Sequence, residues 1–215
     1  MRDNLQTFTH AIHKVEKKII RMAELTRREL ELAVDSLVSK KEEKSHKVLE
    51  LDLKVDDFDY KIHSSILELL MIQPPLPKEL QALTTMNRIS REYERIGDQA
   101  VNIADLGKDT SIRADSQLYM ELKEMCRLTC SMLKGSMEVV QNKNLSQAKE
   151  IAEQDDIVDN YFHQIHLYIV SEMRRNTEQI ESLANLLLVT RYLERSADHV
   201  VNVTRQIEKV TYLIE

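Results

Sequence analysis

Two stretches of the chain carry the same pattern of charged and amide residues, one hundred positions apart. Both read R-x-x-E-R-x-x-D-x-x-V-N, and the identical residues are Arg91, Glu94, Arg95, Asp98, Val101 and Asn102, then Arg191, Glu194, Arg195, Asp198, Val201 and Asn202. Six identities at one offset indicate an internal repeat, which outranks any local motif in deciding the fold. The repeat also carries the polar side chains that could bind a ligand.

The acidic residues of each repeat are spaced to share one side of a helix. Residues four apart lie on a common ridge, so Glu94, Asp98 and Asn102 are expected to line up. A second acidic pair precedes each repeat, and these pairs are Asp52 with Asp56 and Asp155 with Asp159. Carboxylate and amide oxygens are hard ligands that suit cations such as iron, manganese or magnesium. The pattern therefore predicts metal binding in both halves.

Simple hairpin arithmetic places the acidic pairs at matched levels. Asp56 with Glu94, and Asp52 with Asp98, are both centred on position 75, inside a turn that holds all three prolines. The second-half pairs, Asp159 with Glu194 and Asp155 with Asp198, are both centred at 176.5. Two antiparallel hairpins thus predict the same four-carboxylate patch, while the rotation that would make the ridges face each other is not fixed by this arithmetic.

The alternative interpretation is a solvated charged face. Arg91 and Arg95 precede Glu94 and Asp98 by three residues, and surface ion pairs of this kind contribute only ~0–1 kcal/mol each without needing any pattern. Repetition at matched levels, and the neutral oxygen of Asn102, favour a metal site. His63 and His166 lie near these ridges and could be additional ligands, but they are interpreted as partly buried structural residues. Cys126 and Cys130 are interpreted as small core residues, because two cysteines without a partner cluster do not make a zinc site.

Apolar residues with a period of 3.6 predict six helices, and therefore an all-α protein. The expected helices are about Leu5–Ser39, Ser45–Ile72, Lys78–Leu106, Gln117–Gln141, Gln147–Arg174 and Glu178–Leu213, with Ser146 as the N-cap of the fifth. Short connections favour antiparallel neighbours. The expected architecture is a tandem repeat of two three-helix bundles, with domains at 1–109 and 110–215.

Composition narrows the class of function. The 215 residues include three glycines, three prolines and 31% charged residues, which is typical of long helices. A formal net charge of −6 argues against general nucleic-acid binding. The apolar stretches fall short of the ~20 residues that a membrane span requires, and the N-terminus does not resemble a signal peptide. A cytoplasmic protein is expected.

At the repeated residues the chain resembles the PhoU family of phosphate-uptake regulators. The matching segments are Glu94-Arg95-Ile96-Gly97-Asp98-Gln99-Ala100-Val101-Asn102 and Glu194-Arg195-Ser196-Ala197-Asp198-His199-Val200-Val201-Asn202. Acidic pairs on the second and fifth helices complete the family pattern. The resemblance covers essentially the whole chain, including its length and duplication.

The resemblance implies a non-enzymatic negative regulator of phosphate-starvation signalling. It implies contact with the ATPase subunit of the phosphate ABC transporter and with a membrane sensor histidine kinase, a homodimer, and multinuclear clusters of iron or zinc, with manganese or magnesium as further candidates. Carried over by position, the metal ligands would be Asp52, Asp56, Glu94, Asp98, Asn102, Asp155, Asp159, Glu194, Asp198 and Asn202.

Two other functions stay open at this point. A carboxylate-bridged metal oxidase typically uses two E-x-x-H helices, and this chain has a single such spacing, from Glu43 to His46. A metal-free helical scaffold could dock its acidic face on a basic partner. Metal analysis together with reactivity toward dioxygen would separate these functions from the regulator.

Overall fold

The computed structural model describes residues 2–72, 74–108 and 117–211, with the side chains of 2–9, 145, 210 and 211 left aside. Within these ranges the protein consists of helices joined by short connections. The elements are α1 (Arg2–Ser39), α2 (Glu42–Ile72), α3 (Pro77–Lys108), α4 (Gln117–Asn142), α5 (Leu145–Arg175), the 3₁₀ turn η1 (Thr177–Gln179) and α6 (Ile180–Thr211). The predicted all-α class and six helices are confirmed. The expected end of the sixth helix at Leu213 and the domain boundary at 109/110 lie outside the described residues.

The first turn of each half has the same local structure. Lys40 and Lys143, which follow α1 and α4, adopt positive φ values of 52° and 53°. These two positions differ by 103, the same offset that relates Asp52 to Asp155, so residues of α1 and α4 can be matched one to one. The predicted N-cap at Ser146 is wrong. Asn144 caps α5, because its side chain accepts a hydrogen bond from the Ser146 amide.

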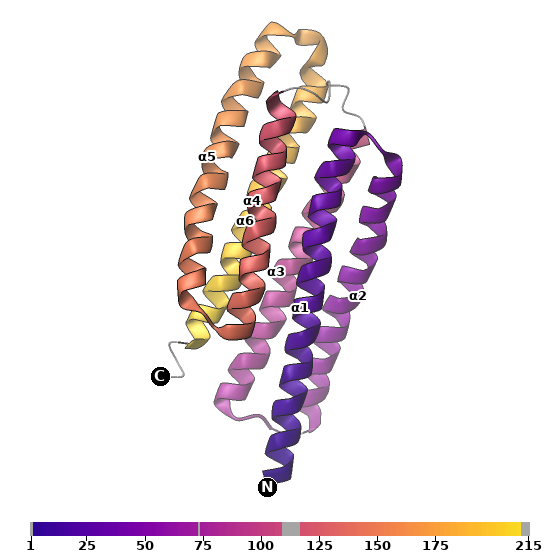
Figure 1. Ribbon diagram of the computed structural model, residues 1–215. Helices are drawn as coiled ribbons and strands as arrows, with labels where there is room; N and C mark the ends of the chain where they lie inside the picture. Colours follow the sequence, from indigo (N-terminus) through magenta and orange to yellow (C-terminus); the bar gives the residue numbers. More distant parts are fainter. Residues whose placement is uncertain (1, 73, 109–116, 212–215) are drawn as a thin grey trace.

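The six helices form one elongated body in which the two halves run antiparallel to each other (Figure 1). Helix α1 packs against α4, and α3 packs against α6, so these four helices form the shared centre. Helix α2 covers α1 and α3, whereas α5 covers α4 and α6. As a result, the α2–α3 turn and the α5–α6 turn lie at opposite ends of the molecule (Figure 1).

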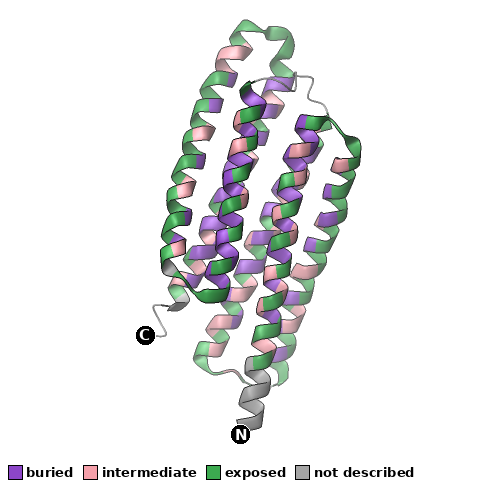
Figure 2. Ribbon diagram, viewed as in Figure 1, coloured by how far each residue is buried: buried purple, intermediate pink, exposed green. Residues whose placement is uncertain are grey.

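The hydrophobic core is continuous between the halves. One cluster of buried side chains includes residues of all six helices, and the buried stripes face inward along each helix (Figure 2). The hydroxyl groups of Tyr93 on α3 and Ser136 on α4 lie 2.9 Å apart inside it. Cys126 belongs to this core and Cys130 packs partly against it, as expected for small apolar residues.

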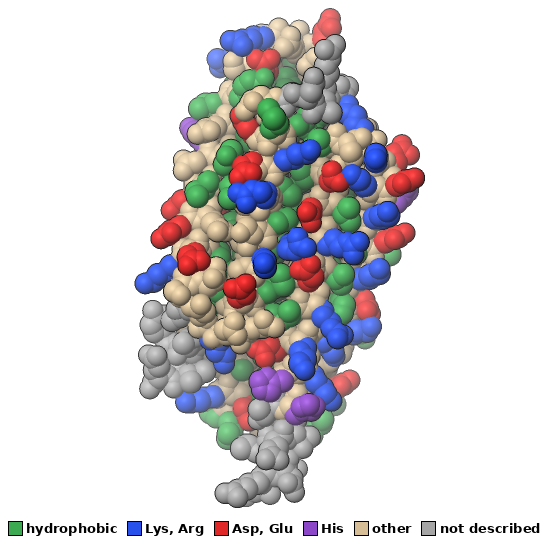
Figure 3. Space-filling view, viewed as in Figure 1, with side chains coloured by type: hydrophobic (Ala, Val, Ile, Leu, Met, Phe, Trp, Pro, Cys, Tyr) green, Lys and Arg blue, Asp and Glu red, His purple; other side chains and the backbone are tan. Residues whose placement is uncertain are grey.

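The outer surface is strongly charged but mixed in sign. On the face over α1 and α4, Lys and Arg side chains alternate with Asp and Glu (Figure 3). In the part of the chain that the structure describes, the helices lack a stretch long and apolar enough to cross a bilayer.

Candidate metal centre

The acidic ridges of α2 and α3 face each other. Burial, followed by repulsion from Asp56 and Asp98, raises the pKa of Asp52 to about 6. Burial also raises the pKa of Asp56, with further repulsion from Asp98 and Asp59. The geometry agrees with this mutual repulsion, because Oδ1 of Asp52 on α2 lies 3.4 Å from the place of a Cβ atom built on Gly97 of α3, the residue before Asp98. The rotation that hairpin arithmetic left undetermined therefore brings the two ridges together.

The second half repeats this arrangement between α5 and α6. Burial, followed by repulsion from Asp159 and Asp198, raises the pKa of Asp155 to about 6, while Arg205 acts in the opposite direction. The pKa of Asp159 is raised by burial and then by Asp198. Burial likewise raises the pKa of Glu194, against the opposing charge of Arg191. Each half thus contains a cluster of carboxylates with excess negative charge.

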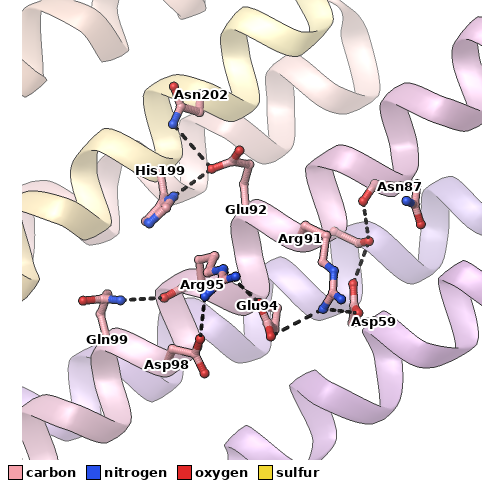
Figure 4. A network of polar contacts seen from close by, with 11 residues as sticks. Asp59, Asn87, Arg91, Glu92, Glu94, Arg95, Asp98, Gln99, His199 and Asn202 are labelled. Atoms are coloured by element: carbon pink, nitrogen blue, oxygen red, sulfur yellow. Dashed lines mark hydrogen bonds and ion pairs between the residues drawn. The ribbon is translucent and has the colours of Figure 1, made fainter.

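The arginines of the repeat do form ion pairs with this cluster. Arg91 lies 3.1 Å from Asp59 and 3.5 Å from Glu94, and Arg95 lies 3.7 Å from both Glu94 and Asp98 (Figure 4). Both arginine side chains are 62% exposed, so solvent screens these pairs. The Oε2 atom of Glu94 is buried and accepts no hydrogen bond from a described residue. The arginines leave part of the cluster uncompensated.

The same position in the second half is stabilised differently. Arg191 pairs with Glu194 and places its guanidinium 5.8 Å from the centre of the Phe162 ring. The Oε2 atom of Glu194 is also buried without a hydrogen bond from the described residues. The repeated glutamate therefore presents one unsatisfied oxygen in each half.

The two asparagines of the pattern do not behave alike. Asn102 is exposed on α3. The Nδ2 atom of Asn202 lies 3.5 Å from Oε2 of Glu92, an oxygen that is also 2.7 Å from Nδ1 of His199. Figure 4 shows Glu92 reaching toward His199 and Asn202 of α6, whereas Glu94, two residues later on α3, lies beside the guanidinium of Arg91, which also contacts Asp59. The amide of Asn202 is thus engaged at the contact between the halves.

The nearby histidines differ from the expectation of partial burial. His63 and His166 are both exposed. The Nδ1 atom of His63 lies 3.0 Å from the side-chain oxygen of Asn87, and the ring of His166 packs edge-on against Phe162. Both histidines follow Asp56 and Asp159 by seven residues, about two helical turns, so they share the exposed face on which those aspartates lie.

Glu29 of α1 is a member of the first cluster that sequence reasoning missed. It is completely buried, and neither of its carboxylate oxygens has a hydrogen-bond partner among the described residues. Burial, followed by repulsion from Asp52, Asp56 and Asp98, raises the pKa of Glu29 to about 9. The sequence does contain an indication of this position, because Glu29 is a charged residue on the otherwise uncharged buried face of α1 between Met22 and Ala33.

The chemistry of both clusters fits a hard cation. The donors are carboxylate oxygens, several of them are unsatisfied, and their mutual repulsion is the kind that a bound cation relieves. In the described ranges, no three or more His, Cys, Asp or Glu side chains are already gathered around one point. Metal binding would therefore require these side chains to rotate toward each other.

Comparison with known proteins identifies the duplicated unit. The sequence model of the PhoU domain matches residues 19–107 and again 122–207. The chain is similar to a phosphate-specific transport system accessory protein PhoU homolog of Clostridium acetobutylicum, with 26% identity over 96% of this chain and 94% of the relative. It is 27% identical to PhoU homolog 1 of Methanothermobacter thermautotrophicus, over 91% of this chain and 90% of the relative.

Solved structures show the same fold. PhoU from Pseudomonas aeruginosa superposes with a TM-score of 0.88 at 20% identity, covering 95% of this chain and 99% of that one. The phosphate transport system regulatory protein PhoU from Streptococcus pneumoniae gives a TM-score of 0.85 at 22% identity, covering 95% and 96%. Tandem three-helix bundles, an internal repeat on the third and sixth helices and two matched domains lead to one conclusion: this chain belongs to the PhoU family.

Proposed function

We propose that this chain is a regulatory accessory protein of phosphate uptake that restrains phosphate-starvation signalling when phosphate is plentiful. The observation that carries the proposal is the double match to the PhoU domain, which spans both halves of the chain. Relatives that align over nearly their full length are named as accessory proteins of the phosphate-specific transport system. A role in the regulation of phosphate transport follows from these similarities.

The proposed activity is protein–protein contact at the cytoplasmic face of the membrane. The proposed partners are the ATPase subunit of the phosphate ABC transporter and a sensor histidine kinase, and the chain is proposed to act as a homodimer without chemical catalysis. Its long helices supply extended charged surfaces, and complementary charges favour rapid and selective association.

Metal clusters are proposed as structural parts of this regulator. Asp52, Asp56, Glu94 and Asp98 would hold metal in the first half, and Asp155, Asp159, Glu194 and Asp198 in the second, with Asn102 and Asn202 as neutral donors. Iron or zinc is proposed first, and manganese or magnesium next. Bound metal would supply positive charge that offsets carboxylate repulsion and would fix α2 against α3 and α5 against α6. Engagement of Asn202 by Glu92 makes it the weakest member of the set.

Deletion of the gene tests the regulatory proposal. In high phosphate, the deletion strain is expected to express alkaline phosphatase and other starvation outputs that the parent strain represses. Pull-down with the intact chain should recover the transporter ATPase. Unchanged repression together with failure to recover the ATPase would reject the proposal and return attention to a scaffold with other partners.

The oxidase alternative gains no structural support. Glu43 and His46 both lie exposed near the start of α2, away from the bundle centre, so they cannot project into a shared metal site in the core. The same purified protein allows a direct check, since metal-loaded chain should consume no dioxygen beyond the metal-only control.

A further inference from the structure

The two carboxylate clusters differ at one buried position. Asp52 and Asp155 correspond at an offset of 103, as do the turn residues Lys40 and Lys143, and the same offset relates Glu29 to Met132. Both residues are completely buried. An apolar side chain therefore fills in the second half the place that a carboxylate occupies in the first, so packing alone does not require an acid there.

Glu29 is aimed at the cluster and not merely near it. A Cβ atom built on Gly97 would lie 3.3 Å from Oε2 of Glu29 and 3.4 Å from Oδ1 of Asp52. The two carboxylates thus converge beside the backbone of α3, where glycine leaves room for them. The corresponding residue of α6 is Ala197, which carries a Cβ atom and is completely buried. At this place the first half has a carboxylate and no methyl group, whereas the second half has a methyl group and no carboxylate.

The buried acid is costly unless something offsets its burial. A carboxyl group without a hydrogen-bond partner loses its hydration, and a second negative charge nearby increases the cost. Glu29 has no described hydrogen-bond partner, and the charged groups that act on it are Asp52 and Asp56 of α2 and Asp98 of α3, all negative. A cation among these oxygens would remove the cost from both sources.

Two further differences make the first cluster the more acidic one. Asp59, with a side chain only 14% exposed, acts on Asp56 and Glu94 and corresponds to the uncharged Phe162. The second cluster has an opposing charge in Arg205, whose counterpart Asp105 pairs with Lys108 at 2.7 Å. Arg205 acts on Asp155 as an opposing charge. The second cluster has one negative charge that the first lacks, since Asp156 acts on Asp155 and Asp159 while its counterpart is Leu53. Asp156 is exposed, so solvent screens its charge. The first cluster therefore has more negative charge to offset.

Resting on the metal binding proposed above, we infer that Glu29 is an additional metal ligand, present only in the first half, and that the first cluster binds a hard cation more tightly than the second. Three helices, α1, α2 and α3, supply this site. The carboxylates of the second cluster come from α5 and α6. Cation binding would consequently tie α1 to the α2–α3 hairpin in the first half, whereas Met132 of α4 offers no equivalent ligand.

Titration with Mn²⁺ tests the inference in two matched backgrounds of the full-length chain, each stripped with chelator. One background carries Asp155→Asn and Asp198→Asn, which disables the second cluster. The other carries Asp52→Asn and Asp98→Asn, which disables the first. Free Mn²⁺ is measured by electron paramagnetic resonance, and circular dichroism checks that each variant is folded. Glu29→Gln, which keeps the shape of the acid, is compared with the parent in both backgrounds, and Met132→Leu serves as the packing control.

Glu29→Gln is expected to weaken Mn²⁺ binding at least about tenfold when only the first cluster is intact. It should leave binding unchanged when only the second cluster is intact, and Met132→Leu should have no effect in either background. Equal Mn²⁺ affinity before and after the Glu29→Gln substitution would overturn this inference and identify Glu29 as a neutral buried acid, while the metal role of the clusters would stand. Absence of Mn²⁺ binding in wild-type protein and both backgrounds would overturn the metal role as well. Should Glu29→Gln fail to fold, Glu29→Met, which copies the second half, replaces it.

Discussion

The carboxylate of Glu92 on α3 lies 2.7 Å from the imidazole of His199 on α6, and this contact joins the two halves through side chains that are 22% and 18% exposed. Each residue sits inside the repeated motif but points away from the carboxylate cluster of its own half. The duplicated helix therefore has two polar faces. One face lines the candidate metal centre, and the other holds the halves together.

Loss of this contact should destabilise the whole bundle. Replacing Glu92 with Ala is expected to lower the free energy of unfolding by about 1–2 kcal/mol, because His199 and Asn202 both lose a partly buried partner. A double-mutant cycle with His199→Ala in urea should assign much of that loss to the pair. The exposed pair of Glu124 and Arg127 on α4 is the control, and Glu124→Ala should cost less than about 1 kcal/mol. Equal costs at both places would show that the Glu92 contact contributes nothing special.

Removal of two ligands should empty one site only. Replacing Glu94 and Asp98 with Ala is expected to abolish metal binding in the first half and leave the second cluster loaded, since α2–α3 and α5–α6 form their sites separately. Elemental analysis of protein purified without chelator or metal-binding tag measures the change. The mirror variant, with Glu194 and Asp198 replaced, should empty the other site. Metal content that stays at the wild-type level in both variants would reject the ligand assignment.

Metal-free protein should become less stable as pH rises. The pKa values of Asp52 and Asp155 are raised to about 6 and that of Glu29 to about 9, so the folded chain binds more protons than the unfolded chain across this range. Stability contributed by these groups is fully present below their unfolded pKa values and is lost as pH rises through the folded ones. Urea unfolding in the presence of chelator, between pH 5 and 9, checks the sign.

The variant Glu29→Gln tests the part of this pH dependence that lies above about pH 6, because it removes the Glu29 carboxyl. It should flatten the loss above about pH 6, because Glu29 is the group with the highest raised pKa among these carboxyls. Saturating Mn²⁺ should oppose the loss in the parent chain by binding the ionised carboxylates. An increase in the stability of metal-free protein from pH 6 to 9, with no difference between the parent and the Glu29→Gln variant, would contradict the assignment of these pKa shifts.

The isolated halves should each be helical but weak. Fragments 1–109 and 110–215 each contain three long helices, yet α1 packs on α4 and α3 packs on α6 in the intact chain. Cutting the chain would expose these apolar faces, so each fragment should melt well below the intact protein and tend to associate. Circular dichroism and size-exclusion chromatography measure both effects. Two fragments without helical signal at low temperature would show that the shared core is indispensable.

The sequence was sufficient for the features that obey simple periodicity. Six helices follow from apolar spacing, and the match of Asp52 with Asp98 follows from counting outward from the proline turn. Contacts that depend on how a helix is rotated about its axis could not be predicted from residue spacing. Asn202 lies four residues after Asp198, yet its amide contacts Glu92 because α6 packs against α3 of the other half. Glu29 was overlooked because it comes from a helix outside the repeated motif.

The substitution Gly97→Ala separates stability from metal binding at the first cluster. Alanine is favoured over glycine inside a helix by up to about 1 kcal/mol. The new methyl group would lie 3.3 Å from Oε2 of Glu29, which is tight, but that atom is the end of a flexible side chain. Metal-free Gly97→Ala protein is therefore expected to be as stable as the parent or more stable, by up to about 1 kcal/mol.

Its affinity for Mn²⁺ at the first cluster should nevertheless fall, because the methyl group occupies the space in which Glu29 and Asp52 converge. The reciprocal change Ala197→Gly is the control. It should cost roughly 1 kcal/mol of stability and leave Mn²⁺ binding at the second cluster unchanged, since Met132 supplies no carboxylate there. Denaturant unfolding and Mn²⁺ titration of the two variants measure both effects. If the Gly97→Ala variant lost both Mn²⁺ affinity and stability, the methyl group would be disturbing the fold and not the site alone.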